Sequence, residues 1–398
     1  MRNSTPESST KAIVWGVEAS PFLLKLESIL RYHERPFKRL PGQGSWTENL
    51  RIAFRLEKAK RQRRVERYPK IDPDLDEYPS VPFFSPDGQS FHYDSSALAR
   101  RLDDESNSDQ APLFPVEPRL GFLAQLIDEA FDEYGLYMVH HLRWVGSASD
   151  TAMGEYTAKE MSRLVTPAIA PLIRTNLPRR QVRRCPYLFS VAPKGYRAPV
   201  EAARVPPSRT GFPPTHDLLF ESWHAYLDAM EHLLERQPYI LGDRFSIADA
   251  SAYGQLSMNL IDPSAARTLR QRAPQTYAWL VEIRDRKTPR PGGALYLSQA
   301  IAPLLSIIMQ TFTPLMKQNE AAWIEAISQG EQLFNEAAFD QNRSLYTGQL
   351  LGHPFRSVIK TFQVRVWRDL CESWHQLPEA EANALRETLP GHALFDQD

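Results

Sequence analysis

Residues 239–250 read YILGDRFSIADA, an apolar run that leads through a turn into the start of a helix. Ser246 and Asp249 have the Ser-x-x-Asp form of a capping box, in which each side chain satisfies a backbone donor at the beginning of a helix. We therefore predict a helix over 246–260. The pattern assigns both side chains to the terminus of that helix.

Upstream of this segment, the first hundred residues alternate between strand and helix patterns. Residues 12–15, AIVW, form a short apolar run with β-branched members, which is typical of a buried strand. Ser20 is a good N-cap and Pro21 suits the first helical position, so we expect a helix from there to about Tyr32. The other predicted elements are strands at 37–40, 81–84 and 91–93, a hairpin turn at 86–88, and helices at 46–67 and 94–103. This order predicts an α/β unit with a small mixed sheet.

Helical periodicity dominates the rest of the chain, apart from a Pro-rich stretch over 186–214 that we interpret as an irregular insertion. The expected helices lie at 119–144, 153–173, 216–236, 273–285, 295–317, 319–338 and 354–375. We divide the chain into a disordered arm (1–10), an α/β domain (11–104), a linker (105–117), an all-helical domain (118–288) and a helical C-terminal extension (289–398).

Composition bounds the classes of function. The chain has 398 residues, of which 42 % are hydrophobic and 24 % charged, and its net charge is -1. This balance excludes a global electrostatic attraction to nucleic acid or anionic lipid. The N-terminus is polar and lacks the apolar core of a secretory signal, and the apolar run 301–309 is shorter than the roughly 20 residues of a membrane helix. We expect a cytoplasmic protein with neither nucleic-acid nor membrane partners.

The two cysteines and the histidine pair predict neither a redox centre nor a metal centre. Cys185 and Cys371 cannot form a disulfide scaffold, and neither lies in a Cys-x-x-Cys motif at a helix start, so we expect inert thiols. His140 and His141 are adjacent but lack convincing further ligands. We therefore expect no metal.

Three separated segments together resemble the cytosolic glutathione transferase family. They are residues 15–22, in which a strand leads into Ser-Pro-Phe; residues 79–98, with PSVPF, Asp87-Gly88 and DSSAL; and residues 239–250. The resemblance covers roughly 11–103 and 118–288. It implies a thioredoxin-like α/β domain followed by an all-α domain, with 289–398 as an addition. In the family the third segment is structural, so we give Asp249 no catalytic role.

The resemblance implies glutathione as co-substrate and places Ser20 at the catalytic serine position. A hydroxyl there donates to the glutathione thiolate at the positive end of the following helix, which favours the ionised sulfur. The alternative is that Ser20 only caps the helix. Because the residue is Ser and not Cys, the pattern favours thiolate activation over thiol–disulfide chemistry.

Two further pairs are implied glutathione contacts. Val81-Pro82 resembles the family's cis-proline turn, whose first residue pairs its backbone with the cysteinyl part of glutathione. Asp94-Ser95 resembles the acidic residue and serine that hold the γ-glutamyl end, where a carboxylate suits the ammonium and a helix N-terminus suits the carboxylate. Here Asp replaces the more common Glu. The alternatives are a strand-edge proline and a helix cap.

The acceptor pocket is expected on the helix at 119–144, which lines the electrophile site in the family. Tyr134, Met138 and His141 share one face of this helix, and Tyr137 with His140 lies on an adjacent one. Core packing is the alternative for such an aromatic face. Two basic runs are interpreted as solvated. The first contains Lys58, Lys60, Arg61, Arg63, Arg64 and Arg67, and the second Arg179, Arg180, Arg183 and Arg184. The alternative for the first run is that it holds the glycyl carboxylate of glutathione.

Two functions remain open from the sequence. The first is a homodimeric glutathione-dependent transferase, in which the thiolate attacks a small, apolar electrophile or carries out related thioether cleavage, dehalogenation or isomerisation. The second is a non-catalytic, glutathione-transferase-like binding or scaffolding protein. It is suggested by the enlarged segment 46–78, the Pro-rich insertion and the extension of about 110 residues.

Overall fold

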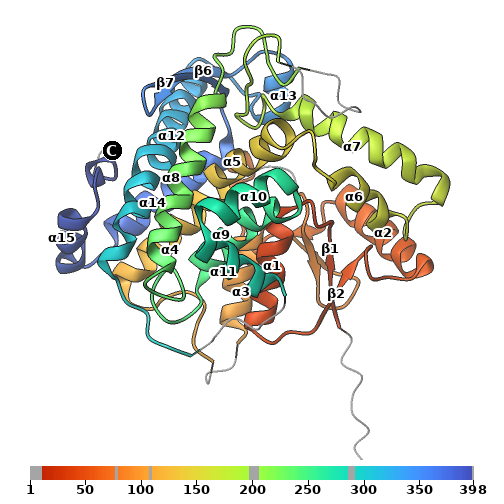
Figure 1. Ribbon diagram of the computed structural model, residues 1–398, viewed down its shortest axis with the longest axis horizontal. Coiled ribbons are helices and arrows are strands. Elements are labelled where there is room, and N and C mark those ends of the chain that lie inside the picture. The colour runs from red at the N-terminus through yellow and green to blue at the C-terminus, as the bar shows by residue number, and fades with distance from the viewer. Residues whose placement is uncertain (1–10, 77–78, 107–109, 197–205, 286–291, 397–398) are drawn as a thin grey trace, which may run out of the picture.

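The structure is a computed structural model that describes residues 11–76, 79–106, 110–196, 206–285 and 292–396. The predicted disordered arm, 1–10, lies outside the described residues. Within them a small α/β unit packs against a larger helical body, and the C-terminal region lies along one side of that body (Figure 1).

The α/β unit has a mixed five-stranded sheet in the order β2-β1-β4-β5-β3. The strands are β1 (Ala12–Trp15), β2 (Phe37–Leu40), β3 (Val65–Glu66), β4 (Phe83–Ser85) and β5 (Phe91–His92). β1 pairs in parallel with β2 and antiparallel with β4, and β5 pairs antiparallel with β4 and in parallel with β3. The predicted mixed sheet is present, with β3 as an additional strand.

Successive side chains of a strand point to opposite faces of the sheet, and helices cover both of these faces. Val14 and Phe84 face α1 (Pro21–Tyr32) and α3 (Ser95–Asp104), which join the main core. Trp15 and Phe83 face the opposite way, toward Ile52 on α2 (Trp46–Arg61). The helix predicted over 46–67 was too long, because the chain takes a left-handed conformation at Arg63, with φ of 53°, and turns into β3.

The helical body is built around one long central helix. It runs as α4 (Pro118–Glu129), a π-helical segment (Ala130–Gly135), α5 (Leu136–His141) and a second π-helical segment (Leu142–Gly146). Around it lie α6 (Met153–Met161), α7 (Ala170–Arg184), α8 (His216–Leu234), α9 (Ile247–Leu256), α10 (Pro263–Arg272) and α11 (Pro274–Arg284). The helix predicted over 153–173 is divided between α6 and α7.

The capping box forms at the start of α9, which packs directly against α1 (Figure 1). The backbone N–H of Ser246 and that of Ile240 donate to the two oxygens of Asp249 at 2.9 and 2.8 Å, and the Ser246 hydroxyl donates at 2.8 Å. Ser246, Asp249 and Ile240 are fully buried. Asp249 thus holds the turn before α9 as well as the helix terminus.

The C-terminal region departs from the all-helical prediction. It contains α12 (Ala302–Ser328), α13 (Asn335–Asp340), the hairpin β6 (Leu345–Leu350) and β7 (His353–Val358), α14 (Thr361–His375) and α15 (Glu379–Thr388). The prediction of a helix over 354–375 was wrong in its first turns, because a two-residue loop closes the hairpin. Leu351 and Gly352 both have positive φ there, 48° and 80°, and Leu is not a residue that signals such a turn.

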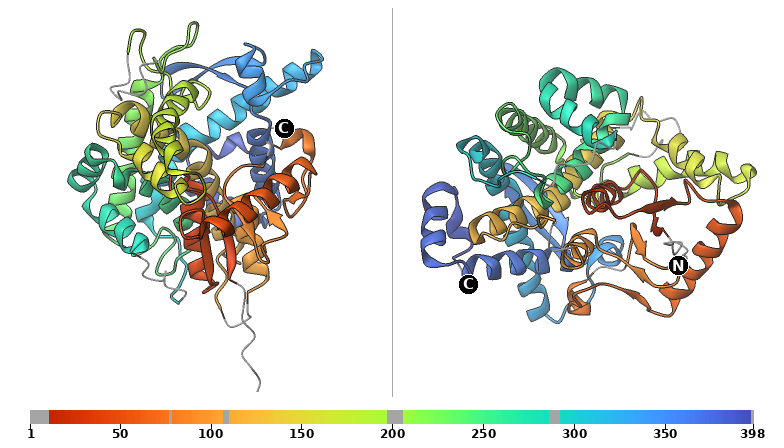
Figure 2. Two further views of the ribbon diagram at one scale, coloured as in Figure 1. Left: turned by 90° about the vertical axis from the view of Figure 1, so that its right-hand side faces the viewer. Right: turned by 90° about the horizontal axis from the view of Figure 1, so that it is seen from below.

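The same region contributes to the core of the helical body. α14 packs along α4 and α12, and in Figure 2 the blue C-terminal helices lie beside the central helix. Trp374 packs against Phe122 of α4 at 5.3 Å between ring centroids and against Phe395 at 5.4 Å. Residues 292–396 therefore do not form a separate appendage, and the predicted domain boundaries stay a prediction.

One helix among the described residues, 299–328, is long and apolar enough to cross a membrane by length and composition. It runs through Pro314 without a break, whereas the sequence predicted two helices at 295–317 and 319–338. Of its most apolar window, 67 % is buried against other parts of the fold. Its apolar side chains therefore pack in the protein core.

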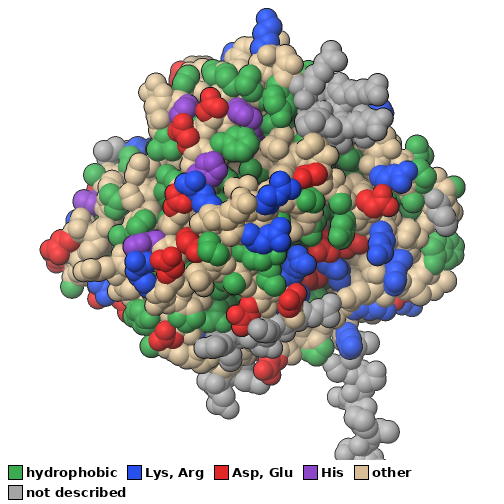
Figure 3. Space-filling model, viewed as in Figure 1, with side chains coloured by type: hydrophobic (Ala, Val, Ile, Leu, Met, Phe, Trp, Pro, Cys, Tyr) green, Lys and Arg blue, Asp and Glu red, His purple; other side chains and the backbone are tan. Residues whose placement is uncertain are grey.

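On the face of the molecule shown in Figure 3, acidic and basic side chains are interspersed.

We expect Asp249→Ala to lower the free energy of unfolding by about 3 kcal/mol, because two buried backbone N–H groups lose their acceptor. The drop in melting temperature in thermal denaturation measures it. Asp243→Ala removes the same charge from an exposed position nearby and should leave the melting temperature almost unchanged. An Asp249→Ala protein with the wild-type melting temperature would contradict the structural role.

Candidate functional site

A cleft of about 850 Å³ opens where the α/β unit, the central helix and the C-terminal region meet. The α/β unit contributes Ser20, Val81, Pro82, Asp94 and Ser95, which are the five residues that the sequence predicts as glutathione contacts. They come from three loops that are far apart along the chain. The fold therefore brings the predicted half-site together, and the chemical role of each residue stays a prediction.

Ser20 has both of the properties expected of it. It is the N-cap of α1, where its Oγ accepts a hydrogen bond from the backbone N–H of Leu23 at 3.4 Å, and Pro21 occupies the first turn. Its side chain also lines the cleft and is 8 % exposed. A ligand atom beside Ser20 would lie at the positive end of α1, where negative charge is favoured.

The Val81–Pro82 peptide bond is cis, as the resemblance implies. It lies immediately before β4, and both residues line the cleft. A peptide backbone that lies at the start of a strand in this way offers its N–H and C=O groups to an extended ligand.

The Asp94 carboxylate has more partners within the protein than the sequence indicates. It is the N-cap of α3, and its Oδ1 accepts hydrogen bonds from the backbone N–H groups of Ser96 and Ala97 at 3.1 Å each. Its Oδ2 accepts from Arg67 Nε at 2.5 Å. Burial opposes ionisation, but Arg67 and Arg365 hold the pKa of Asp94 below its ordinary value. The carboxylate therefore already has its counter-ion.

Arg67 corrects the interpretation of the first basic run as solvated. Its side chain is 9 % exposed, lines the cleft, and also donates from Nη1 to the backbone oxygen of Pro69 at 2.8 Å. Counting charges along the sequence could not single it out, because the other members of the run are exposed on α2 and in the turn that follows it. The strand β3 carries Arg67 away from that helix and into the cleft.

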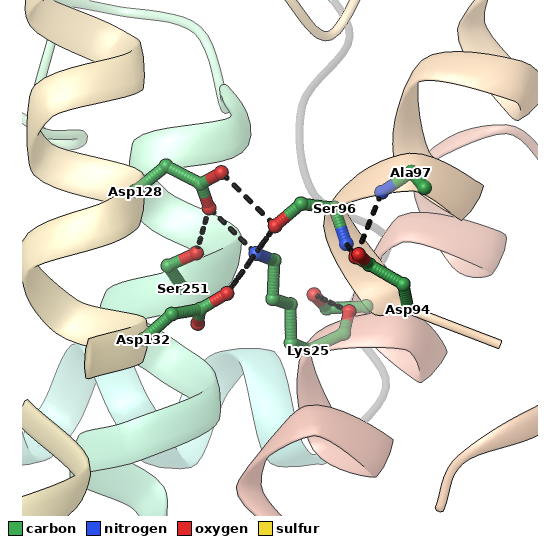
Figure 4. A network of polar contacts seen from close by, with 8 residues as sticks. Lys25, Asp94, Ser96, Ala97, Asp128, Asp132 and Ser251 are labelled. Carbon is green, nitrogen blue, oxygen red and sulfur yellow. Dashed lines mark hydrogen bonds and ion pairs between the residues drawn. The ribbon is translucent and has the colours of Figure 1, made fainter. Parts of the chain in front are cut away.

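A buried ion-pair network joins the α/β unit to the central helix beside these residues (Figure 4). Lys25 of α1 is fully buried, and its Nζ donates to Asp128 Oδ1 and Asp132 Oδ2 at 2.6 Å each and to Ser96 Oγ at 2.7 Å. Burial acts to lower the pKa of Lys25, but the two carboxylates raise it above its ordinary value. Ser251 of α9 donates to Asp128 as well.

The prediction of Tyr134, Met138 and His141 as acceptor contacts was wrong. All three are fully buried, and none of them lines the cleft. The hydroxyl oxygens of Tyr134 and Ser222 are 2.7 Å apart, and His141 Nδ1 lies 2.7 Å from Ser190 Oγ. The central helix passes through the core, so its aromatic face is covered by other helices, which is the alternative that the sequence left open.

The neighbouring face of the same helix lines the cleft instead, and it is mainly polar. It presents Glu129, Asp132, Glu133, Leu136, Tyr137 and His140. This lining differs from the apolar acceptor pocket that we expected. Burial and the neighbouring carboxylates raise the pKa of Glu129 well above its usual range. Burial also raises the pKa of Asp132 to about 6 and that of Glu133 to about 7.

The C-terminal region supplies the third wall of the cleft. Gln363 Nε2 donates to Glu133 Oε2 at 2.8 Å and to the Tyr137 hydroxyl at 2.7 Å, and Lys360 Nζ also donates to that hydroxyl. Arg365 on α14 lines the cleft and is paired with Asp369 at 3.1 Å. Sequence reasoning missed these residues because no motif precedes them and because they lie beyond the segments that resemble the family.

Burial favours the uncharged forms of both cysteine thiols and of His140. Burial raises the pKa of Cys185 and of Cys371 to about 12, so both thiols are protonated at neutral pH. Burial lowers the pKa of His140 to about 3. Within the described residues, no group of three or more His, Cys, Asp or Glu side chains is arranged to hold a metal ion.

Residues 213–281, which run from the start of α8 into α11, match the family model described as glutathione S-transferase, C-terminal domain. The chain carries a glutathione S-transferase C-terminal domain. This match includes the segment 239–250 and confirms the family resemblance. The mixed sheet of the α/β unit and the helical body after it confirm the predicted fold class: a thioredoxin-like unit and a helical glutathione S-transferase domain, followed by an additional C-terminal region.

Several solved structures are similar to this glutathione S-transferase-like chain. The beta-etherase LigF from Sphingobium sp. strain SYK-6 is 15 % identical, over 75 % of this chain and 99 % of that one, with a TM-score of 0.41. A glutathione S-transferase from Pseudomonas fluorescens is 18 % identical, over 71 % and 98 %, with a TM-score of 0.32. FzlA from C. crescentus is 13 % identical, over 75 % and 92 %, with a TM-score of 0.37. The sequence matches no curated protein significantly.

Lys25→Met tests the buried network of this glutathione S-transferase-like fold. We expect it to lower the free energy of unfolding by about 3 to 5 kcal/mol at pH 7, because two buried carboxylates lose their counter-ion. Protonation relieves that repulsion, so the deficit should shrink as the pH falls from 7 to 5. Chemical denaturation at both pH values measures it.

Lys38→Met is the matched control, since it removes the same charge from a partly exposed ion pair with Glu48. Its cost should be below about 1 kcal/mol and nearly independent of pH over the same range. Equal losses for the two variants would contradict a structural role for the buried network.

Proposed function

We propose that the chain is a glutathione-dependent transferase whose substrates meet in the three-walled cleft. The observation that carries this proposal is the convergence of Ser20, Val81-Pro82 and Asp94-Ser95 in one cleft. The family match over 213–281, which is independent of these residues, supports it. Related thioether cleavage, dehalogenation and isomerisation use the same glutathione half-site and belong to the same proposal.

In the proposed complex the glutathione sulfur lies beside Ser20 at the N-terminus of α1. The Ser20 hydroxyl and the positive end of the helix favour the thiolate, which is the reactive form of the thiol. The backbone of Val81 pairs with the cysteinyl part of glutathione, and Ser95 with the N-terminus of α3 holds the γ-glutamyl carboxylate. Proximity of thiolate and acceptor in one cleft then supplies much of the rate.

Two features of the original prediction change in this proposal. Asp94 is paired with Arg67, so we assign it to positioning Arg67 and capping α3 rather than to the ammonium group of glutathione. The acceptor is a polar molecule, because the cleft face of the central helix is lined with carboxyl groups. Homodimer formation, the cytoplasmic location and the domain boundaries are proposed on the resemblance alone.

The alternative function, a non-catalytic binding or scaffolding protein, is favoured by one observation. Asp94, the acidic member of the predicted half-site, has its charge balanced by Arg67 before any ligand arrives. Removing residues 289–398 cannot separate the two functions, because this region shares the core of the helical body. Ligand binding to the full chain is the appropriate test.

Isothermal titration of the full-length protein with reduced glutathione should show saturable binding at one site. Ser95→Ala removes a proposed ligand contact and should weaken the affinity about 10-fold, the loss expected for one hydrogen bond to a charged group. Ser106→Ala, a serine-to-alanine change outside the cleft, is the matched control and should bind as the wild type does. Absence of binding heat at several temperatures, from folded protein, would favour the scaffolding function.

Ser20→Ala should lower the rate of thioether formation at least about 10-fold at pH 7, because the thiolate loses one hydrogen-bond donor. Glutathione affinity should stay within about 3-fold, since the backbone contacts remain. Single-turnover kinetics together with titration measure the two effects separately. Unchanged turnover would limit Ser20 to its function as the N-cap of α1.

A further inference from the structure

The cleft face of the central helix carries three carboxyl groups that the fold does not fully neutralise. Glu129, Asp132 and Glu133 are spaced so that their side chains lie on the same side of the helix, and all three line the cleft. Their partners within the protein are few. Asp132 contacts the α/β unit through Lys25 and Ser96, and Glu133 contacts the C-terminal region through Gln363. The cluster lies on the central helix, which is the wall expected to contact an acceptor.

Asp132 has one oxygen without a partner. The residue is 6 % exposed, and its Oδ2 accepts the hydrogen bond from Lys25. Its Oδ1 is buried and has no hydrogen-bond partner, and in Figure 4 that oxygen carries no dashed line. A buried carboxylate oxygen without a donor is destabilising. A ligand that donates a hydrogen bond there removes this cost.

Glu129 is the second group without a partner. It is half-buried, and in the described part of the chain no hydrogen bond or ion pair reaches its carboxyl group. The nearby cation is Arg365, which is itself paired with Asp369 at 3.1 Å. Glu133 differs, because its Oε2 accepts a hydrogen bond from Gln363.

The cations that face this cluster already have partners. From α1, Lys25 is bonded to Asp128 and Asp132. The other charged groups around the cluster are Asp94 with Arg67 from the α/β unit, and Lys360, Arg365 and Asp369 from the C-terminal region. Lys360 donates to the Tyr137 hydroxyl, and Gln363 is neutral. Carboxyl groups therefore outnumber the cations that could balance them.

We propose that this face is the acceptor subsite and that it takes a substrate bearing a primary ammonium group. The ammonium would donate to Asp132 Oδ1 and to the carboxylate of Glu129, which uses two of its three N–H donors. The inference deepens the proposed function and rests on it for the role of the occupant as acceptor. Under this inference the electrophilic substrate is a cation, whereas the sequence analysis predicted an apolar molecule.

Cation binding at this subsite is coupled to proton release. Burial raises the pKa of Asp132 to about 6, that of Glu133 to about 7 and that of Glu129 well above its usual range, so protonation of the cluster is favoured as the pH falls below neutral. An ammonium group favours the ionised carboxylates and displaces those protons. Affinity for a cation should therefore rise as the pH increases from 6 to 8.

Titration of the full-length protein with n-butylammonium and with n-butanol tests the subsite directly. The cation should bind at least about 10-fold more tightly than the neutral alcohol, and more tightly at pH 8 than at pH 6. Titrations in buffers with different ionisation heats should show proton release on binding. Equal affinities for the two probes would overturn the inference.

Glu129→Gln should reduce n-butylammonium affinity about 10-fold and remove most of its preference over n-butanol. This variant disturbs no internal partner, so its fold should be retained. Asp132→Asn, checked by thermal denaturation because it weakens the pair with Lys25, should have the same effect. Glu387→Gln removes the same charge from the exposed surface of α15 and should bind as the wild type does. An undiminished affinity in Glu129→Gln would overturn the inference.

Glutathione also carries an ammonium group, which could occupy the same subsite. A competition experiment between glutathione and n-butylammonium distinguishes an acceptor ammonium from the ammonium of glutathione. Binding of n-butylammonium in the presence of saturating glutathione supports an acceptor subsite. If glutathione displaces the probe and its des-amino analogue does not, the subsite holds the ammonium of glutathione and the acceptor assignment is wrong. If the probe binds but glutathione gives no heat, the cation site stands and the transferase function fails.

Discussion

The structure depends on the burial of Lys25 between Asp128 and Asp132. A lysine at the centre of a fold is tolerated only when its charge is compensated, and here two carboxylates and a serine hydroxyl surround it. These contacts connect α1 to α3 and α4, so they fix the α/β unit against the helical body. Because Ser20 and Asp94 begin α1 and α3, the same network sets the positions of both halves of the proposed glutathione site.

This arrangement also explains the polar character of the cleft. The carboxylates that compensate Lys25 lie on the central helix, and the next residues on the same face, Glu129 and Glu133, extend the acidic surface into the open space. Burial raises the pKa of each, so their charge depends on what occupies the cleft. The interaction that stabilises the interface between the two units therefore also makes this wall of the cleft acidic, which is the basis of the proposed preference for a cationic ligand.

The C-terminal region converts a two-walled cleft into a three-walled one. Trp374 of α14 and Phe395 near the C-terminus both pack against Phe122 of α4. This packing places Gln363 and Arg365 beside the carboxyl groups of the central helix. Removal of this region would expose the core of the helical body and would also change the balance of charges in the cleft. In the proposed function, this addition supplies part of the acceptor side, while the proposed glutathione half-site lies on the α/β unit.

The sequence by itself determined the features that depend on local chemistry. The strand before Ser20-Pro21, the N-cap of α1, the cap at Asp94 and the capping box at Asp249 follow from residue types at fixed spacing, because each interaction spans only a few residues. These motifs predicted the fold class and the residues that line one half of the cleft. Only the tertiary structure decided which face of the central helix meets the cleft, that Arg67 neutralises Asp94, and that residues near 363 complete the site. Those contacts join segments tens to hundreds of residues apart, and the burial that selects among them exists only when the whole chain has packed.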